Sequence, residues 1–479
     1  MAQEEKDSLD ERCRTILEEL YNPQPEHDFK QTSQLLAEFK VLTREKRISQ
    51  SILDERCIKT LISYSSQNQI EAQKCLSNLI LNYAHLRESL IEPYVSCLEH
   101  RLKDILSRQF VENDKVPLEN EEQHCEVLYY DLRIIFLLSA LCSGSRSNVR
   151  DRLLELLLQV TLLEAEKFRS DNYLLVIESL KTLFNLTMDK CIDANLTAQL
   201  IKKLFSLVGT EGDQSAADDE SSTLNHTDKL LVNLIHLLTN MPKEVYLELS
   251  DEDADKILNH LDEQLKTFSK GSFRDTVLPV LNTCANICRY KETVRRRWFD
   301  QIISSTKEFE KRPEEYDTLR GRLVKLMTSV DVHIKEIAAE FLHALCGGDT
   351  EKFITYTGFG NSAAFLATKG LLSQTSRQNT EECQGNESDV EYRELRGRLD
   401  PITGKIEQPK RNPMEGMSEE EKEWHANELA GAIAKLSSLG VVRPMQVGLD
   451  GEVSELCPRS DDKEESLGEN KDDNSDLNS

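Results

Sequence analysis

The 479-residue chain has few of the residues that interrupt helices, and few aromatic ones. It contains 12 Pro and 19 Gly, and Phe, Trp and Tyr together make up 6% of its residues. Pro and Gly are the poorest helix formers, whereas Leu, Glu and Lys, which are abundant here, are good ones. Strand-like alternation of polar and apolar residues is scarce. These absences favour a helical protein and argue against a fold built on a sheet.

Long apolar runs and targeting signals are missing too. The longest apolar stretch, around residues 134–142, is far too short to span a bilayer. Residues 1–6 are acidic and lack the apolar core of a signal peptide. Position 2 is not Gly, and the last residues carry no prenylation signal. We therefore expect a soluble protein without a transmembrane segment.

An excess of positive charge is also absent. The 85 acidic residues outnumber the 59 Lys and Arg residues, which gives a formal net charge of −26. Because nucleic acids and anionic membranes are bound through clustered Lys and Arg, neither is expected to be the main partner. One basic run, at residues 289–297, departs from this pattern. We interpret it as a solvated helix face, with a second docking patch as the alternative.

Patterns typical of catalysis, metal binding or cofactor binding are not found. The 12 cysteines are scattered singly without a CxxC pair, as in reduced intracellular proteins, and the ten histidines are dispersed. Residues 358–363 match the dinucleotide-binding spacing GxGxxA, but they follow a predicted helix rather than a strand. We expect a turn between helices there, with Asn361 or Ser362 capping the second helix. Neither an enzyme nor a resident cofactor or metal is expected.

What the chain does have is helical periodicity. Apolar residues recur at helical spacing almost everywhere up to residue 370. Four segments share an apolar face interrupted by a single Asn, at irregular intervals: Asn78, Asn185, Asn240 and Asn286. Helix pairs that cannot bury their apolar faces alone stack on their neighbours. The prediction for residues 8–370 is an all-α, armadillo- or HEAT-like helical-repeat superhelix with a concave binding surface.

Beyond residue 370 the composition changes. Residues 371–400 are polar and acidic, which predicts a mobile linker. Residues 401–447 are predicted to form a C-terminal extension with an amphipathic helix at 418–439, begun by a capping box of Ser418 and Glu421. Residues 458–479 are rich in Asp and Glu, and a disordered acidic tail is expected there.

Two kinds of side chain could bind a partner in such a superhelix. Lys40 and Arg44 lie four residues apart on one predicted helix and so project from the same face. They could anchor a carboxylate or an acidic segment, or they could form a solvated basic pair. Asn78 and Asn185 could hold the backbone of a peptide, as Asn does in armadillo-type solenoids, or could be polar groups satisfied within the core. From the residues alone, the solvated pair is preferred for Lys40 and Arg44, and the alternatives for Asn78 and Asn185 stay open.

Several longer motifs resemble those of the synembryn family. The strongest are residues 323–328 (LVKLMT), 338–342 (AAEFL), 356–361 (YTGFGN) and 412–417 (NPMEGM), with weaker similarity at 130–133 and 183–187. Synembryns are cytosolic chaperones and nucleotide exchange factors for heterotrimeric G-protein α subunits. The resemblance covers nearly the whole chain. It implies a solenoid whose concave face captures the C-terminal helix of a GDP-bound or nucleotide-free α subunit.

The resemblance also implies roles for particular residues. By family position, Lys40 and Arg44 would hold the terminal carboxylate region, and the groove would be lined by Asn78, Tyr130, Asn185 and Met188. Lys40 stands where the family usually has Arg, so bidentate geometry is lost at this position. The acidic segment that is phosphorylated in the family is shorter here, and Ser388 is its candidate phosphorylation site. The implied location is the cytoplasm, with indirect recruitment to the cell cortex.

Two functions from different classes follow. The first is a G-protein α chaperone and exchange factor that promotes GDP release. The second is an armadillo-type adaptor or vesicle-tethering scaffold without exchange activity. Recovery of α subunits that GTP releases from the protein would favour the first, and partners insensitive to GTP would favour the second.

Overall fold

The computed structural model divides into two compact units, Met1–Ile406 and Glu407–Ser479, which are described separately. The residues that the structure describes are 2–22, 29–44, 46, 48–109, 121–168, 172–188, 192–208, 226–267, 273–303, 311–371, 414, 416–441, 445–447 and 453–455.

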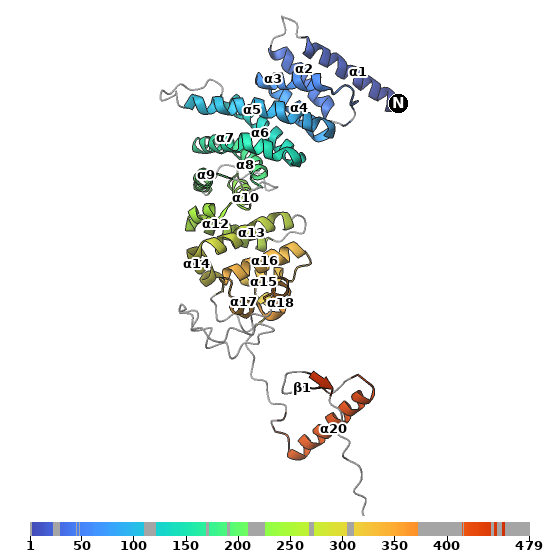
Figure 1. The fold of residues 1–479 in the computed structure, drawn as a ribbon, viewed down its shortest axis with the longest axis vertical. Helices are drawn as coiled ribbons and strands as arrows, with labels where there is room; N and C mark the ends of the chain where they lie inside the picture. The colour runs from blue at the N-terminus through green and yellow to red at the C-terminus, as the bar shows by residue number, and fades with distance from the viewer. Residues whose placement is uncertain are drawn as a thin grey trace, which may run out of the picture. The chain divides into compact units, whose positions relative to one another are not determined.

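The first unit is a stack of helices in two layers (Figure 1). The first layer contains α1 (Ala2–Tyr21), α3 (Glu55–Ser66), α5 (Arg87–Gln109), α7 (Arg146–Glu166), α9 (Ala194–Leu207) and α12 (Asp251–Lys266). The second layer contains α2 (Phe29–Thr43), α4 (Ile70–Asn82), α6 (Glu121–Leu141), α8 (Tyr173–Leu186), α10 (His226–Leu238), α13 (Phe273–Tyr290) and α16 (Val332–Leu345). Each helix of the second layer packs on the next one, from α2 to α16.

Shorter elements complete the first unit. They are α11 (Lys243–Glu248), α14 (Glu292–Ile303), α15 (Leu319–Leu326), α17 (Thr350–Thr357), α18 (Phe359–Thr368) and the 3-10 turns Ala84–Leu86, Ser143–Ser145 and Pro313–Glu315. In Figure 1 the second layer from α4 to α16 lies to the right of α5, α7, α9, α12 and α14.

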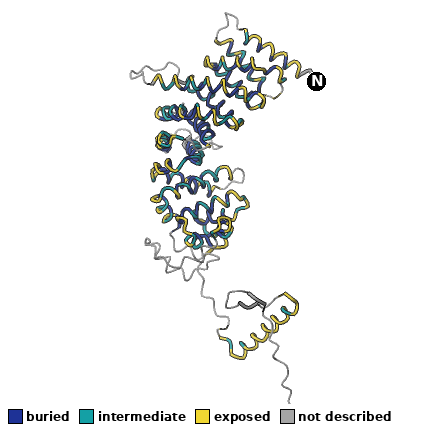
Figure 2. The backbone as a smooth tube through the Cα atoms, viewed as in Figure 1, coloured by how far each residue is buried: buried dark blue, intermediate teal, exposed yellow. Residues whose placement is uncertain are grey.

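Local sequence explains where many of these helices begin. Side-chain oxygens accept hydrogen bonds from first-turn N–H groups at Asp54, Asp193, Ser250, Thr318, Asp331 and Asp349. Such caps satisfy N–H groups that have no partner inside the helix. The core, largely of Leu, Ile and Val, runs through the stack, and Figure 2 shows buried residues throughout it. The predicted all-α helical-repeat fold is therefore confirmed.

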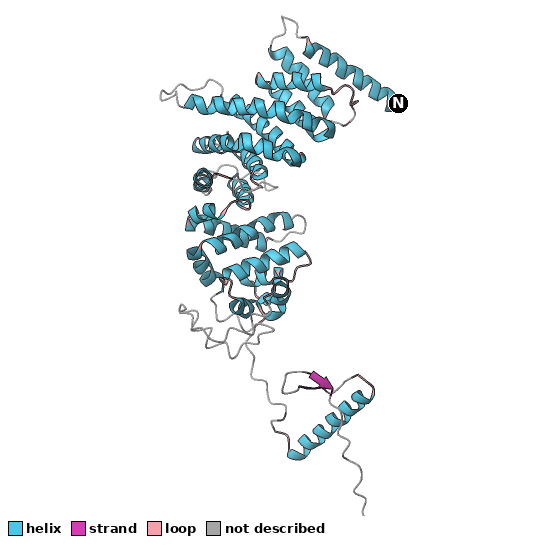
Figure 3. Cartoon of the chain, viewed as in Figure 1, coloured by secondary structure: helices cyan, strands magenta, loops and turns pink. Residues whose placement is uncertain are grey.

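Among its described residues, the second unit contains a long helix, seen in Figure 3, and a pair of short strands. Helix α20 (Glu419–Ser438) begins with the capping box of Ser418 and Glu421, and none of its residues is buried. The strands β1 (Met445–Val447) and β2 (Val453–Glu455) pair antiparallel, with Gln446 opposite Ser454. This hairpin was not foreseen from the sequence, because three-residue strands are too short to show alternation.

The GxGxxA segment is a turn between two helices, as expected, but the cap is different. Gly358 ends α17 and precedes the first residue of α18. Its φ of 80° is a left-handed backbone conformation that favours Gly. Asn361 and Ser362 lie inside α18 instead of capping it, and the Asn361 amide donates to the Thr357 carbonyl oxygen at 2.8 Å. The prediction that one of them caps the helix was wrong, because a backbone turn at Gly358 already ends the first helix.

The basic run falls on the end of α13 and on α14, where carboxylates pair with it. Arg297 bonds Asp251 and Asp255, both at 2.7 Å, and Arg289 lies 3.1 Å from Glu340. These contacts make the run an ion-paired and only partly exposed helix face. Of the predicted linker at 371–400, only Leu371 is described; the rest of it, with Ser388, and the predicted tail at 458–479 lie outside the described residues. No helix in the described ranges is long and apolar enough to cross a membrane.

Candidate partner-binding face of the second layer

The centre of the candidate site is the Glu71 carboxylate on α4. Its Oε2 pairs with the Nζ of Lys40 from the last turn of α2, and its Oε1 accepts from Lys74 Nζ at 2.8 Å. The three side chains are 18–25% exposed, so the cluster is partly shielded from water. Burial acts to raise the pKa of Glu71, but hydrogen bonds from Lys40 and Lys74 outweigh it and lower the pKa. Glu71 is therefore ionised at neutral pH.

Tyr130 on α6 borders this cluster. The Lys74 ammonium lies 5.1 Å from the centre of the Tyr130 ring, within the range of a cation–π contact. It also lies 3.7 Å from the carboxylate of Glu126, which is on α6 like Tyr130. Tyr129 packs edge-on against Tyr130 with ring centres 5.1 Å apart. Burial raises the pKa of the Tyr130 hydroxyl, so this group stays protonated and able to donate a hydrogen bond. Lys40 and Tyr130 thus belong to one continuous surface across α2, α4 and α6.

A second charged cluster follows on α6 and α8. The buried Glu178 carboxylate pairs with Arg133 and with Lys181, each at 3.1 Å. The Arg133 guanidinium also lies 5.7 Å from the centre of the Phe136 ring. Arg133 and Lys181 were not proposed from the sequence. Their spacing of nearly fifty residues carries no signal until α6 and α8 are known to be neighbours.

Asn residues tie neighbouring helices of the second layer together in a repeated pattern. The Asn78 amide donates to the Lys40 carbonyl oxygen and to Thr43 Oγ1, both at 3.2 Å. Asn185 likewise donates to a carbonyl oxygen and a hydroxyl oxygen of α6. Asn240, which follows α10, donates to the Phe184 carbonyl oxygen of α8 and to the hydroxyl of Thr187, directly after α8. A side-chain amide has two N–H donors, so a partner would meet only the carbonyl oxygens of these side chains. For the N–H groups of Asn78 and Asn185, these bonds favour the alternative that the side chains are polar groups satisfied within the protein.

Two predicted residues lie at the ends of helices. Helix α2 ends at Thr43, so Arg44 is in the following turn and does not share the helix with Lys40 as the spacing predicts. Its carbonyl oxygen accepts a hydrogen bond from Asn82 at 3.1 Å, which fixes the turn. Met188 follows α8, is 46% exposed, and its sulfur lies 3.2 Å from Arg146 Nη1.

Exposed apolar side chains recur at the C-terminal ends of these helices. Val41 on α2, Leu81 on α4 and Leu141 on α6 are 41–56% exposed, and Met188 continues the series after α8. Sequence reasoning missed the first three. Val41 and Leu81 fall on the side of their helices opposite the buried residues, which is the signal that could have found them.

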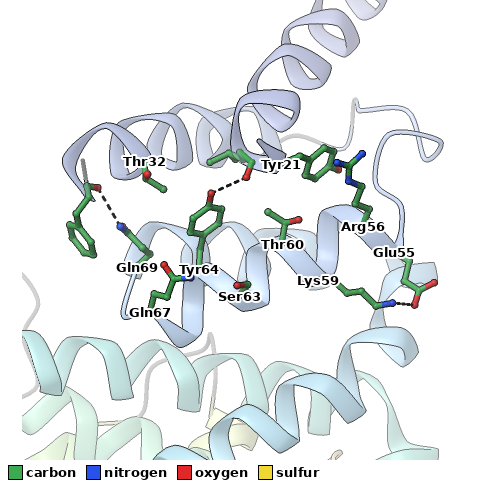
Figure 4. Close-up of a pocket in the computed structure, with 12 residues that line it drawn as sticks. Tyr21, Thr32, Glu55, Arg56, Lys59, Thr60, Ser63, Tyr64, Gln67 and Gln69 are labelled. Carbon is green, nitrogen blue, oxygen red and sulfur yellow. Dashed lines mark hydrogen bonds and ion pairs between the residues drawn. The ribbon is translucent and has the colours of Figure 1, made fainter. Parts of the chain in front are cut away.

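A cavity near the amino terminus is not part of this face. Residues of α1, α2 and α3 line an open pocket of about 880 Å³, shown in Figure 4. Tyr64 bonds the Leu20 carbonyl oxygen at 2.8 Å, and the Arg56 guanidinium lies 4.1 Å from the centre of the Tyr21 ring. None of the six predicted partner-binding residues lines this pocket.

The fold places this chain in the class of helical-repeat proteins. Its second layer presents charged, amide and apolar side chains across at least four neighbouring helices, and repeat proteins bind their partners on extended surfaces of this kind. The described residues contain no cluster of side chains able to hold a metal ion.

Comparison with known proteins gives the family. Residues 35–452 match the family model of the guanine nucleotide exchange factor synembryn. The chain is 31% identical to Chaperone Ric-8A of Xenopus tropicalis, over 88% of this chain and 84% of that protein. It is 28% identical to Chaperone Ric-8A of Danio rerio, over 94% and 89%. The chain therefore belongs to the synembryn family of guanine nucleotide exchange factors.

Proposed function

We propose that this protein is a chaperone and guanine nucleotide exchange factor for heterotrimeric G-protein α subunits. It captures the C-terminal helix of the α subunit on the second layer, across α2, α4, α6 and α8. Membership of the synembryn family and the chaperone name of its relatives support the class of activity. The observation that carries the proposed site is the combination of Lys40 and Lys74 with exposed Val41 and Leu81 on adjacent helices.

This combination suits an amphipathic helix that ends in a carboxylate. Lys40 and Arg44 attract the carboxylate, and the apolar side chains at the helix ends cover the apolar side of the partner. Tyr130 and Met188 extend the apolar contact. Asn78 and Asn185 hold the helices of the face in register and offer their carbonyl oxygens as acceptors.

The proposed exchange mechanism needs no bond chemistry in this protein. Capture of the C-terminal helix favours a conformation of the α subunit with low affinity for GDP. By thermodynamic linkage, bound nucleotide and bound solenoid then weaken each other, so GTP entry releases the α subunit. Binding of an incompletely folded α subunit by the same face would stabilise that state and shield its exposed surface until nucleotide binding completes folding, which is chaperone activity.

Two further elements belong to the proposal. Leu429, Ile433 and Leu436 of α20 are 41–62% exposed and lie on one side of that helix, which suits a second contact with the α subunit. Ser388, which lies outside the described residues, is the candidate phosphorylation site. Binding of α subunits located at the membrane would bring the protein indirectly to the cell cortex.

The rate of GDP release from a purified α subunit tests the proposal. We expect this protein to accelerate release, and we expect the acceleration to be lost when the α subunit lacks its last residues. Equal acceleration of the truncated α subunit would refute capture of its C-terminal helix. No acceleration of any α subunit would refute the exchange activity itself.

A further inference from the structure

Lys40 of the proposed carboxylate site, together with the neighbouring Lys74, already holds a carboxylate of this chain. Glu71 presents one oxygen to Lys40 and the other to Lys74, so its carboxylate lies between the two ammonium groups. Lys40 comes from α2, whereas Glu71 and Lys74 lie one turn apart on α4. A bridging geometry of this kind is what a bound terminal carboxylate would adopt between two cations.

The local charge is balanced in the free protein. Lys40 and Lys74 carry two positive charges, and Glu71 and Glu126 carry two negative charges, so the formal sum is zero. The Glu71 side chain is 18% exposed, which makes it the most shielded of the four. A partner's carboxylate that approaches Lys40 therefore meets an occupied cation and a neighbouring like charge. Like charges held close together cost free energy, and partial burial increases that cost.

We propose that Glu71 is a placeholder carboxylate that occupies the site of the partner's terminal carboxylate and determines how tightly that carboxylate is held. The proposal rests on the function proposed above and deepens it. Binding then exchanges one carboxylate for another at Lys40 and Lys74, and release is assisted by the return of Glu71. Exchange of this kind keeps the lysines paired in both states, so neither state contains an unpaired, partly buried cation. Such a device suits a factor that must bind and then release its partner.

A different role for Glu71 predicts the opposite result. If Glu71 only holds Lys40 in the orientation that the partner needs, loss of its charge would weaken binding. If Glu71 competes with the partner, loss of its charge would strengthen binding. The direction of the change therefore separates the two roles.

The experiment compares wild type with Glu71→Gln, which preserves the size of the side chain. The probe is a synthetic peptide with the sequence of a G-protein α C-terminal helix, made once with a free carboxylate and once as the C-terminal amide. Affinities are measured by titration calorimetry at low salt. Glu38→Gln is the matched control, because Glu38 is an exposed acidic residue of α2 that pairs with Arg12 of α1. Thermal denaturation of each variant verifies that it is folded.

We expect Glu71→Gln to bind the free-acid peptide about three- to fivefold more tightly than wild type, as suits partly exposed ion pairs. The amidated peptide should bind both proteins equally, and Glu38→Gln should behave as wild type. Unchanged or weaker binding of the free-acid peptide to Glu71→Gln would overturn the placeholder role while leaving the proposed function intact. Equal tightening for both peptides would also overturn it, because the effect would then be general electrostatics. If wild type binds neither peptide, the proposed function fails at its first step, and the placeholder role fails with it.

Discussion

Asn185 on α8 donates a hydrogen bond to Ser139 Oγ on α6 at 3.1 Å, across 46 positions of sequence. The same amide nitrogen donates to the Phe136 carbonyl oxygen at 3.2 Å, and Ser139 in turn donates to that oxygen at 3.0 Å. Because Asn78 and Asn240 repeat this arrangement, it is a feature of the stacking of the second layer. Asn185 is 7% exposed, so its loss affects stability as well as any contact with a partner.

Asn185→Ala is expected to lower the free energy of unfolding by about 1–2 kcal/mol, because two hydrogen bonds, one buried and one part-buried, are lost and each of the two acceptors loses a donor. The midpoint of urea denaturation measures the change. Asn195→Ala is the control, since Asn195 is exposed and its side-chain oxygen accepts a hydrogen bond from Gln199 within the same helix, at 3.3 Å. If Asn195→Ala lowered the free energy of unfolding as much as Asn185→Ala, the repeated Asn contact would contribute no more to stability than an exposed Asn does.

Lys40→Glu combined with Arg44→Glu is expected to weaken binding of an α subunit by about tenfold, since it places negative charge where the terminal carboxylate should lie. Titration calorimetry with an intact α subunit measures the affinity. Arg14→Glu combined with Lys59→Glu applies the same charge change to exposed residues of the first layer and should leave the affinity nearly unchanged. Unchanged affinity in Lys40→Glu with Arg44→Glu would show that these two residues do not bind the terminal carboxylate.

Asp131 is a buried hub, and Asp131→Ala is expected to destabilise the protein strongly. Its carboxylate accepts from Tyr94 and Gln73, both at 2.6 Å, and pairs with Arg101, which is only 13% exposed. Removal of one member of a buried pair leaves the other charge uncompensated, at a cost of about 3–5 kcal/mol. Urea denaturation should detect it, with Asp151→Ala as the control, because the Asp151 side chain on α7 is exposed. If Asp131→Ala lowered the free energy of unfolding no more than Asp151→Ala, the Arg101 guanidinium would have found water or another acceptor at little cost.

Glu340 on α16 should make a contribution to stability that depends on pH. Burial acts to raise the pKa of Glu340, but hydrogen bonds from Lys369 and Arg289 outweigh it and lower the pKa below the ordinary 4.5. A carboxyl whose pKa is lower in the folded state stabilises the fold above its unfolded pKa, and this stabilisation is lost as pH falls through the folded pKa.

Glu340→Gln should therefore lower the free energy of unfolding at pH 7 by up to about 1 kcal/mol, the scale of partly exposed ion pairs. The difference from wild type should shrink as the pH falls below 4.5, where the carboxyl begins to be protonated. Urea denaturation of both proteins across this range measures it. A difference that stays constant with pH would assign the effect to packing rather than to charge.

Leu429→Glu combined with Ile433→Glu on α20 is expected to weaken binding of the α subunit without changing the stability of the first unit. Both side chains are exposed, at 62% and 49%, so no core packing is lost. Asn427→Glu with Ala430→Glu on another side of α20 is the matched control. Affinity by calorimetry and the thermal midpoint are the two measurements. Equal affinities for the two double variants would remove α20 from the proposed interface.

The fold was predictable because its signals are local. Helical spacing of apolar residues and caps such as Asp54 and Ser250 act within a few residues of chain, so the sequence indicates them directly. The same holds for the capping box that begins α20. The β1–β2 hairpin and the exact end of α2 before Arg44 were not predictable, because each depends on contacts too few or too distant to leave a periodic signal.

The candidate site was predictable only in part. The sequence and the family resemblance pointed to Lys40, Asn78 and Tyr130. They did not reveal that Glu71 pairs with Lys40 or that the Asn78 amide is used inside the protein. These partners are 31 and 38 positions apart, and no rule of spacing joins residues on successive repeats of irregular length.

By itself, the sequence determined that this chain is a stack of helices with an acidic surface, because helix propensity, capping and apolar periodicity act over short distances. The tertiary structure alone decided which polar side chains meet across neighbouring helices. That pairing depends on how far each helix is shifted along its neighbour, and the shift is set by the packing of the whole layer. It is this packing that places Glu71 between Lys40 and Lys74.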